Sequence, residues 1–552
     1  MTPLSQKIPL SKRLLKSPFF AIIIEIKTFF LKKLQATQIL MHAKTFSATP
    51  LGVHAHPVQV EVDLSPGIPA FYIVGLPDAA LKESSKRILT SLKNSGFRFV
   101  GKKVTVNLAP ADLKKEGTLL DLPIALGILM TGGYLELSED FLQETIFLGE
   151  LSLDGSIGFI KGALAIAYDA HKKWGKKRVI LPSKNAAEAA FVDGIEIIGV
   201  DHLTQLMAYL RGEITIEPTP RPTIAAARSH DTLDFAHVIG QEQAKRALQI
   251  AAAGNHNILF IGSPGSGKTM LAKRLPTIMP PLSLEETLET TKIYSVSGKL
   301  GNQPLVTERP FRSPHHTTSQ AGLVGGGAYP QPGEISLAHN GILFLDELTE
   351  FKRDTLEVLR QPLESQEVCI ARVNQSISFP ANFLLIAALN PCPCGFFGDK
   401  KRSCTCTQQA IAKYLGKLSG PLLDRIDLQV YVPSVDYETV AHKRQGASSA
   451  VLYASVERAR TTQHARFGSS LSCNSHMTAE QIESSCITTP AAQEIIKKAF
   501  DHLNLSMRRY HKLLKVARTI ADLEGTELID AKHVQEALMY RSLDSHLERN
   551  AA

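Results

Sequence analysis

The chain of 552 residues is too long for a single hydrophobic core, and its length predicts about three domains. Hydrophobic residues account for 44% and charged residues for 21%, the balance of an ordinary soluble globular protein. The net charge of +8 permits binding to a polyanion without establishing it. Four of the seven cysteines crowd between Cys392 and Cys406, which excludes the pattern of a secreted disulfide scaffold and favours a reducing, cytoplasmic compartment.

Residues 1–40 form a basic segment that differs from the rest of the chain. Its apolar run, residues 19–30, is interrupted by Glu25 and Lys27, whereas a bilayer span needs about 20 uninterrupted apolar residues. No small-residue cleavage site follows the run, so it is not typical of a signal peptide. We expect a disordered extension, or a start codon upstream of true initiation at Met41, and no stable membrane insertion. A membrane-surface anchor is the alternative.

Residues 41–216 alternate short β-like runs with segments of helical length and spacing, the pattern of an α/β domain. Strands are predicted at residues 58–62, 70–74, 103–107 and 178–181, and helices at residues 78–95, 120–131 and 161–174. A stretch rich in proline and then in small residues follows at residues 217–232, which indicates a linker.

A second α/β domain is predicted at residues 233–435, and it contains all of the nucleotide chemistry. Residues 436–552 are predicted to form the last domain. It contains a polar patch at residues 446–450 and is mostly helical from about Ser455 onward. A further polar stretch interrupts it at residues 468–476. Its later helices are expected at residues 478–485, 490–503, 507–524 and 530–541.

An apolar strand at residues 258–261 leads into a glycine-rich turn, and a helix continues at residues 270–275. The turn has the P-loop pattern, in which backbone N–H groups surround phosphate oxygens at a helix N-terminus. Its residues are Gly262, Ser263, Pro264, Gly265, Ser266, Gly267, Lys268 and Thr269. Lys268 is expected to reach the β- and γ-phosphates of ATP, and the Thr269 hydroxyl is expected to bind Mg²⁺.

A second apolar strand, residues 341–345, delivers Asp346 and Glu347 at its carboxyl end. At about 80 residues after a P-loop, this pair predicts a hydrolysis site. One carboxylate, Asp346, would hold Mg²⁺ through water, and its neighbour Glu347 would polarise the attacking water. Asn390 closes a third apolar strand, residues 383–389, where its amide would orient that water. The alternative for Asn390 is a turn residue before the proline that follows.

Cys392, Cys394, Cys404 and Cys406 form two C-x-C pairs on either side of a short loop. Four thiolates in so short a stretch can surround Zn²⁺ tetrahedrally, although the C-x-C spacing is tighter than the usual C-x-x-C knuckle. We expect a zinc site here, and small loop residues without a metal are the alternative.

Several longer motifs closely resemble the YifB/ComM family of magnesium-chelatase-like AAA+ ATPases. Residues 234–241, ahead of the P-loop, look like the AAA+ adenine-pocket box. The other matching segments are residues 44–47, 60–67, 312–317, 332–341, 390–395, 418–427, 505–508 and 514–523. The resemblance covers Met41 to about Leu543, and it implies a P-loop AAA+ α/β core followed by a C-terminal helical lid of the magnesium-chelatase type.

The resemblance also implies a homo-hexameric ring with ATP and Mg²⁺ at the subunit interfaces. Arg425 corresponds to the arginine finger that reaches a neighbour's γ-phosphate, and Arg508 corresponds to the sensor arginine of the lid. Planar cations at these positions would neutralise transition-state charge. From the residues alone, either arginine is equally compatible with a structural salt bridge.

Residues 148–170 of the first domain resemble the Lon-protease-like domain, of the ribosomal S5 domain 2-like fold. Lon cleaves peptides with a serine–lysine dyad. Gap-free alignment with that domain places Leu164 at the lysine, and the stretch at residues 115–119 places Leu119 at the serine. Because leucine neither attacks a carbonyl nor accepts a proton, we interpret this domain as a scaffold and not as a protease.

The family resemblance implies an ATP-driven motor on single-stranded or branched DNA, with branch migration or helicase activity in recombination and natural transformation. A segment at residues 312–327, which includes His315 and His316, is a candidate pore loop. A hairpin at residues 368–378, with Arg372 near its turn, is a second candidate for contact with phosphates in a channel. A solvated loop and hairpin are equally compatible with these sequences.

Two other functions stay open, namely a chelatase-type motor subunit for metal insertion and an ATP-dependent protein-remodelling factor. Chelatase motor subunits begin directly with the AAA+ module, whereas this chain carries a Lon-like domain ahead of it. We therefore expect no porphyrin partner.

Overall fold

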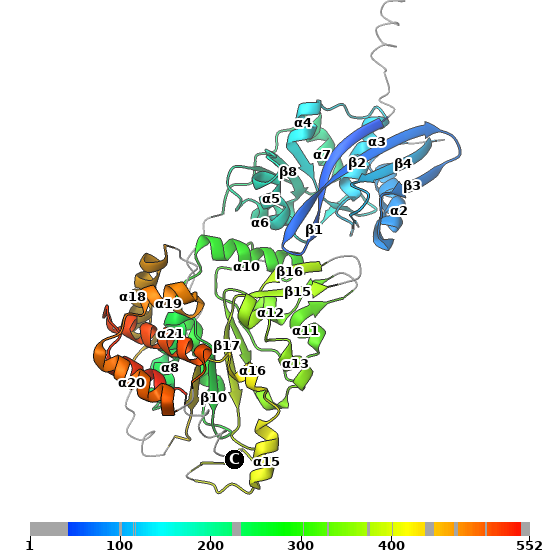
Figure 1. Cartoon of the computed structure of the whole chain (residues 1–552). Coiled ribbons are helices and arrows are strands. Elements are labelled where there is room, and N and C mark those ends of the chain that lie inside the picture. Colours follow the sequence, from blue (N-terminus) through cyan, green and yellow to red (C-terminus); the bar gives the residue numbers. More distant parts are fainter. Residues whose placement is uncertain are drawn as a thin grey trace, which may run out of the picture.

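The computed structural model describes most of the chain after residue 41 (Figure 1). The described residues are 42–98, 102–113, 115, 117–222, 233–301, 303–327, 330–371, 376–399, 401–435, 446–468, 473–502 and 505–541. The expected extension at residues 1–40 and the side chain of Arg372 lie outside them. Among the helices of the described residues, none is both long and apolar enough to cross a membrane.

The first structural unit, blue and cyan in Figure 1, contains two main sheets. One has the order β1-β2-β4-β3, in which only the β3–β4 pair is parallel, and the other has three parallel strands in the order β5-β8-β9. The strands are β1 (His42–Leu51), β2 (His54–Pro66), β3 (Ala70–Val74), β4 (Lys102–Ala109), β5 (Thr145–Phe147), β8 (Arg178–Pro182) and β9 (Glu196–Val200), with a small hairpin of β6 (Glu150–Leu151) and β7 (Ile157–Gly158). The helices are α2 (Ala79–Asn94), α3 (Asp121–Thr131), α4 (Glu139–Glu144), α5 (Ala163–Lys172), α6 (Ser183–Ala189) and α7 (Leu203–Leu210).

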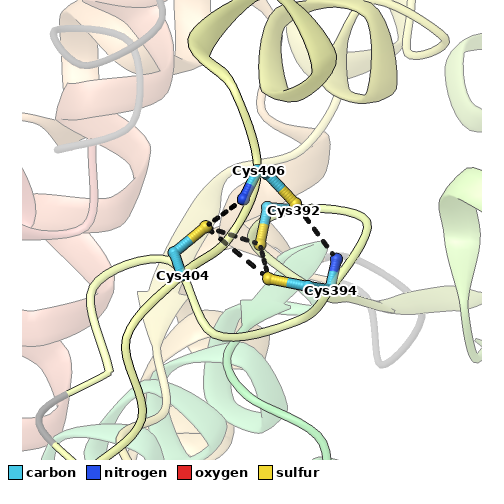
Figure 2. A group of neighbouring side chains, drawn as sticks. All are labelled: Cys392, Cys394, Cys404 and Cys406. Atoms are coloured by element: carbon cyan, nitrogen blue, oxygen red, sulfur yellow. Dashed lines mark hydrogen bonds between the residues drawn. The ribbon is translucent and has the colours of Figure 1, made fainter.

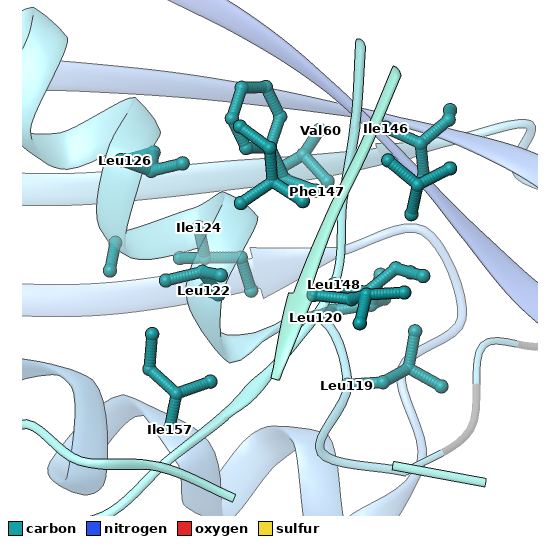
Figure 3. Close-up of a cluster of buried hydrophobic side chains, with 14 of the residues drawn as sticks. Val60, Leu119, Leu120, Leu122, Ile124, Leu126, Ile146, Phe147, Leu148 and Ile157 are labelled. Atoms are coloured by element: carbon teal, nitrogen blue, oxygen red, sulfur yellow. The ribbon is translucent and has the colours of Figure 1, made fainter. Parts of the chain in front are cut away.

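Helix α3 forms the centre of this unit, and all of its residues are buried. It packs against β1, β2 and α2, and a Cβ atom on Gly127 would lie only 2.5 Å from Val62 Cγ2. Leu119, just before the helix, belongs to the same apolar core (Figure 3). Leu164 in α5 is also fully buried. Apolar packing therefore accounts for both leucines at the dyad positions.

Strand β1 is absent from the prediction based on sequence because it buries polar side chains. The hydroxyl of Thr45 donates to the Pro123 carbonyl oxygen at 3.0 Å, and the hydroxyl of Ser47 donates to the Phe147 carbonyl oxygen at 2.8 Å. These hydrogen bonds offset the cost of burying the hydroxyls. A pattern of alternating hydrophobic residues does not reveal a strand of this kind.

The second unit is built on a parallel sheet with the order β11-β14-β17-β10-β18. Its strands are β10 (Ile258–Ile261), β11 (Phe311–Arg312), β14 (Ile342–Leu345), β17 (Leu384–Leu389) and β18 (Leu428–Tyr431). The unit also contains two hairpins, β12 (Gly325–Gly326) with β13 (Gln331–Pro332) and β15 (Glu367–Ala371) with β16 (Ser376–Pro380). The helices are α8 (Glu242–Gly254), α9 (Lys268–Arg274), α10 (Leu284–Ser297), α11 (Gln320–Val324), α12 (Glu334–Leu337), α13 (Arg353–Glu357), α14 (Pro362–Ser365), α15 (Gln408–Leu415) and α16 (Gly420–Leu423).

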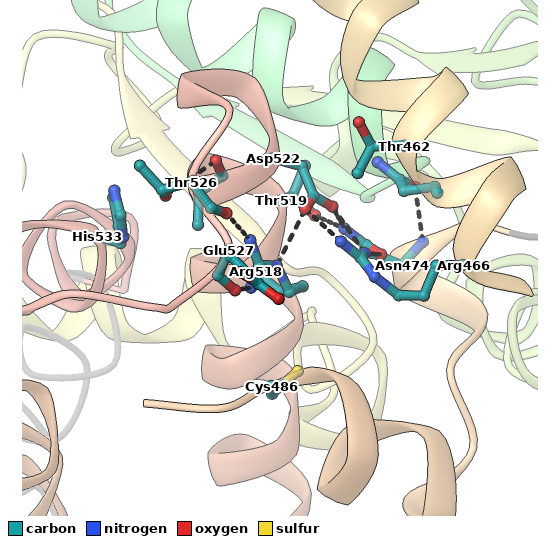
Figure 4. Close-up of polar contacts among 12 residues, drawn as sticks. Thr462, Arg466, Asn474, Cys486, Arg518, Thr519, Asp522, Thr526, Glu527 and His533 are labelled. Atoms are coloured by element: carbon teal, nitrogen blue, oxygen red, sulfur yellow. Dashed lines mark hydrogen bonds and ion pairs between the residues drawn. The ribbon is translucent and has the colours of Figure 1, made fainter. Parts of the chain in front are cut away.

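The third unit is helical and covers one side of the parallel sheet, in orange and red in Figure 1. It contains α18 (Ser449–Phe467), α19 (Ala479–Ser485), α20 (Pro490–His502), α21 (Met507–Glu524) and α22 (Ala531–Met539). Helix α18 begins earlier than expected, and the backbone N–H of Ser449 in its first turn, which has no partner within the helix, donates to Asp234 Oδ1 at 3.0 Å. Asp522 of α21 joins that helix to α18 by accepting from Arg466 at 2.6 Å, and it also accepts from Arg518 of its own helix at 3.0 Å (Figure 4).

The first two units contact each other through α5 and α10. The N–H of Gly162 donates to the Ser295 carbonyl oxygen at 3.2 Å, and Lys292 Nζ lies 3.2 Å from the centroid of the Tyr168 ring. Together the units confirm an α/β fold with a helical C-terminal region. We propose residues 41–216, 233–435 and 436–552 as the domains of the chain, joined by a linker at residues 217–232.

Candidate nucleotide site and cysteine cluster

Three neighbouring parallel strands end at one edge of the sheet and bring the predicted nucleotide residues together. The P-loop follows β10, Asp346 and Glu347 follow β14, and Asn390 follows β17. The order β14-β17-β10 makes these three strands adjacent. The carboxyl edge of an open parallel sheet is the usual ligand-binding edge of such folds.

The P-loop has the backbone that a phosphate cradle needs. Gly265 and Gly267 have φ values of +77° and +95°, which favour glycine. Lys268 is buried, and its Nζ donates to the carbonyl oxygens of Gly262 at 2.6 Å and Ser263 at 3.0 Å. It also donates to Asn390 Oδ1 at 3.3 Å, which joins the ends of β10 and β17. Burial lowers the pKa of Lys268, and the nearby acidic pair acts in the opposite direction.

The two predicted magnesium ligands are in direct contact. The Thr269 hydroxyl donates to Asp346 Oδ2 at 2.7 Å. Hydroxyl and carboxylate oxygens are suitable ligands for Mg²⁺, which retains several waters and binds through few protein groups. Gln241, at the end of the adenine-pocket box, lies beside the P-loop, because its Nε2 donates to the Ser266 carbonyl oxygen at 3.3 Å. The residues present therefore fit a nucleotide with its magnesium ion.

Glu347 contacts His316, which the sequence analysis placed in the candidate pore loop. The Glu347 side chain is 54% exposed, and its Oε2 lies 3.3 Å from His316 Nδ1. His315 stacks on His316 with ring centroids 4.1 Å apart. The interpretation of His316 as part of a pore loop needs correction, because its ring lies against a carboxylate of the nucleotide edge. The contact joins segments that follow adjacent strands, β11 and β14, so spacing along the chain carries no signal for it.

Arg425 and Arg508 lie at the opposite edge of the sheet from the P-loop. Arg425 stands just before β18, which runs parallel to β10 with Leu428 opposite Ile258. It is therefore at the amino edge, whereas Lys268 follows the carboxyl edge. Arg425 forms an ion pair with Glu364, and Arg508 Nη2 lies 3.5 Å from the same carboxylate.

A basic cavity of about 340 Å³ surrounds these two arginines. Its charged and titratable lining residues are Glu364, Arg425, Asp427, His476, Arg508, His511, Lys512 and Lys515. Asp427 anchors the lid to the sheet at this point, because its carboxylate lies 2.6 Å from Lys512 Nζ on α21. Burial acts to raise the pKa of Asp427, but Lys512 and His256 lower it below its ordinary value. The lid therefore holds Arg508 beside Arg425.

The four clustered cysteines converge in space (Figure 2). Their sulfur atoms all lie within 4.8 Å of one another, and Cys392 Sγ is 3.3 Å from Cys394 Sγ and 3.6 Å from Cys404 Sγ. A tetrahedral Zn²⁺ with Zn–S bonds of ~2.3 Å separates its sulfurs by about 3.8 Å, so the cluster has suitable dimensions. Backbone N–H groups of Phe396 and Thr405 lower the pKa of Cys394 to about 5, whereas the pKa values of Cys404 and Cys406 are raised beside the neighbouring sulfurs, so the first thiolate of the cluster forms at Cys394.

Comparisons with known proteins agree with this architecture. Residues 234–440, 60–185 and 446–541 match the families described as magnesium chelatase, subunit ChlI; subunit ChlI of Mg-chelatase; and magnesium chelatase, subunit ChlI C-terminal. The chain is 43% identical over 508 residues to YifB of Escherichia coli, covering 90% of this chain and 97% of that protein. It is 42% identical over 515 residues to the competence protein ComM of Haemophilus influenzae, covering 92% and 99%. The chain belongs to the YifB/ComM family.

The YifB/ComM family consists of magnesium-chelatase-like ATPases, and it implies ATP and Mg²⁺ as the cofactors of the site. The chain is also 30% identical over 116 residues to an archaeal Lon protease of Halobacterium salinarum, covering 19% of this chain and 16% of that protein. This match agrees with the expected Lon-like domain.

We expect purified protein to carry about one zinc ion per chain, held by the four thiolates. Elemental analysis of freshly reduced protein measures this ratio directly. Cys404→Ser should lower the zinc content to near zero, whereas Cys369→Ser, at an exposed cysteine outside the cluster, should leave it unchanged. Absence of zinc from the reduced, unchanged chain would contradict the assignment.

Proposed function

We propose that this protein is an ATP-driven ring motor that acts on DNA, with branch migration or helicase activity in homologous recombination and natural transformation. Assembly into a ring is supported by one observation: the P-loop and the Arg425–Arg508 pair lie at opposite edges of one sheet. Phosphoryl transfer needs cations at the γ-phosphate, and both arginines lie away from the P-loop of their own chain.

A ring resolves this separation because each subunit presents two different surfaces to its neighbours. The basic cavity of one subunit would face the P-loop edge of the next, which is a heterologous contact that closes when the rotation is right. Glu364 would then release Arg425 and Arg508 to the neighbour's phosphates. A homo-hexamer is the expected closed form for this family.

Within one subunit, the site residues have a consistent division of roles. Lys268 would hold the β- and γ-phosphates, and Thr269 with Asp346 would hold Mg²⁺. Glu347 would polarise the attacking water, and Asn390 would orient it from the adjacent strand end. The contact between Lys268 and Asn390 supports this division, because it ties the phosphate-binding amine to the residue beside the water.

Two observations support DNA as the substrate. A relative is named a competence protein, and the β15–β16 hairpin that the sequence predicts is present, with one face buried in the core. Two basic residues of the lid are engaged in ion pairs within the protein. Arg518 is fully buried against Asp522, and Lys512 is paired with Asp427, so both cations serve the fold.

A chelatase-type motor for metal insertion is the second candidate, because all three family matches are to magnesium-chelatase subunits. An ATP-dependent protein-remodelling factor is the third. The first unit does not separate this chain from the chelatases, because its residues 60–185 match subunit ChlI of Mg-chelatase. The identity to the competence protein ComM extends over 92% of this chain, so we place the DNA motor first.

We expect forked DNA to bind this protein and to raise its ATPase rate, with binding that weakens steeply as salt increases. Each phosphate contact releases a counterion, so the logarithm of the binding constant falls linearly with the logarithm of salt concentration. Arg372→Ala should reduce the stimulation by DNA while preserving the basal rate. Arg458→Ala, at an exposed position on lid helix α18, is the matched control. If forks, junctions and single strands all fail to bind at low salt, the DNA motor is wrong and the other two functions move ahead.

A further inference from the structure

The segment from Cys392 to Cys406, here called the cysteine loop, folds back onto the P-loop. Asp399 Oδ2 accepts a hydrogen bond from the Ser263 hydroxyl at 2.6 Å. Gly395 has a φ of +86° and approaches Pro264 so closely that a Cβ atom would lie 2.6 Å from the proline Cδ. Two adjacent P-loop residues are therefore held from the outside by the cysteine loop.

Asp399 is fixed within its own loop before it reaches the P-loop. Its Oδ1 atom accepts from the backbone N–H groups of Lys401 at 2.8 Å and Arg402 at 3.1 Å, which organises the turn between the two C-x-C pairs. The segment contains no regular helix or strand among its described residues. Its shape therefore depends on local hydrogen bonds and on a link between the two C-x-C pairs.

A metal ion at the cysteines would join them. Ordering an irregular loop costs about 1–2 kcal/mol of conformational entropy per residue, and metal binding to a site of this kind offsets that cost. With the metal bound, Asp399 and Gly395 are held at the P-loop. Without it, we expect the loop to sample conformations in which these contacts are broken, so that the P-loop would lose part of its preorganisation for phosphate.

We propose that metal binding at Cys392, Cys394, Cys404 and Cys406 strengthens nucleotide binding at the P-loop, with Asp399 as the positioning residue that connects the two sites. The coupling is reciprocal, because a metal that tightens nucleotide binding by some factor requires the nucleotide to tighten metal binding by the same factor. The proposal rests on the proposed nucleotide and zinc sites, and it is independent of DNA as the substrate.

The test measures both sides of this coupling on the full chain. The dissociation constant of a fluorescent ATP analogue with Mg²⁺ is measured for zinc-loaded protein, for protein stripped of zinc by a chelator that is then removed, and after zinc is added back. We expect stripping to weaken binding by about fivefold or more, and reloading to restore it. Zinc affinity, measured by competition with a chromophoric chelator, should rise by the same factor when a non-hydrolysable ATP analogue is present.

Two substitutions examine the connection itself. Ser263→Ala removes the hydroxyl donor, so its nucleotide affinity should become nearly insensitive to zinc while its zinc content stays normal. Asp399→Asn removes the charge but preserves one carbonyl acceptor for the turn, and it should also weaken the coupling. Arg402→Gln, on the exposed side of the same loop, should retain the full coupling.

Equal nucleotide affinity of loaded and stripped protein would overturn the proposal, as would tighter binding after Asp399→Asn, which would mean that the carboxylate acts by repelling phosphate. Full coupling in the Ser263→Ala protein would exclude Asp399 as the connection. These outcomes differ from a failure of the nucleotide site, in which the analogue binds in neither metal state. They also differ from a failure of the DNA motor, which leaves both dissociation constants unaffected.

Discussion

Glu347→Gln is expected to bind ATP normally and to hydrolyse it about 10²–10⁴-fold more slowly than the unchanged chain. The carboxylate stands at the carboxyl end of β14 beside Asp346, where it can polarise a water molecule. A glutamine preserves its shape and removes its basicity. Turnover measured by phosphate release, together with binding of a fluorescent ATP analogue, separates the two effects.

Lys268→Ala is the companion variant, and it should abolish nucleotide binding itself. The buried amine donates to two P-loop carbonyl oxygens and to Asn390, so its removal leaves the phosphate cradle without its cation. A conservative surface change on the same helix, Lys273→Arg, provides the control for folding. Near-normal turnover by the Glu347→Gln protein would exclude Glu347 as the group that activates water.

Arg425→Ala and Arg508→Ala should each bind ATP normally and lose about 10³-fold or more in turnover, as loss of an arginine finger does in other P-loop enzymes. Each should recover part of its activity when mixed with Glu347→Gln subunits. In a randomly mixed ring, about a quarter of the interfaces combine an intact Glu347 on one subunit with intact arginines on the next. Steady-state ATPase rates across a series of mixing ratios measure this recovery.

Arg508→Ala is the cleaner of the two variants, because the Arg508 side chain is 45% exposed whereas Arg425 is largely buried. Arg425 also donates to the carbonyl oxygens of Arg360 at 3.0 Å and Pro421 at 2.7 Å, so its loss affects the local fold. Recovery with Arg508→Ala subunits places this arginine at the neighbour's nucleotide. If no mixture of either variant with Glu347→Gln exceeds the activity of its components, the sites are not shared between subunits.

Much of this protein was predictable from local patterns along the chain. Short stretches of neighbouring residues are enough to predict the strand before the P-loop and the strands that lead to Asp346 and Asn390. They also show the close spacing of the four cysteines. Apolar runs of strand length and glycines at tight turns need no knowledge of distant contacts. The family resemblance, which the comparisons confirm, rests on motifs of the same local kind.

Only the tertiary structure decided which of these pieces meet. The sequence contains His316 and Glu347, Arg425 and Arg508, and Ser263 and Asp399, but their pairing depends on strand order and on how the lid docks. The burial of polar residues likewise depends on distant contacts. Thr45 and Ser47 lie inside the first unit, and their hydrogen-bond partners are 78 and 100 residues away in the sequence. Short-range patterns report backbone preference and hydrophobic periodicity, whereas contacts between distant residues follow from the path of the whole chain.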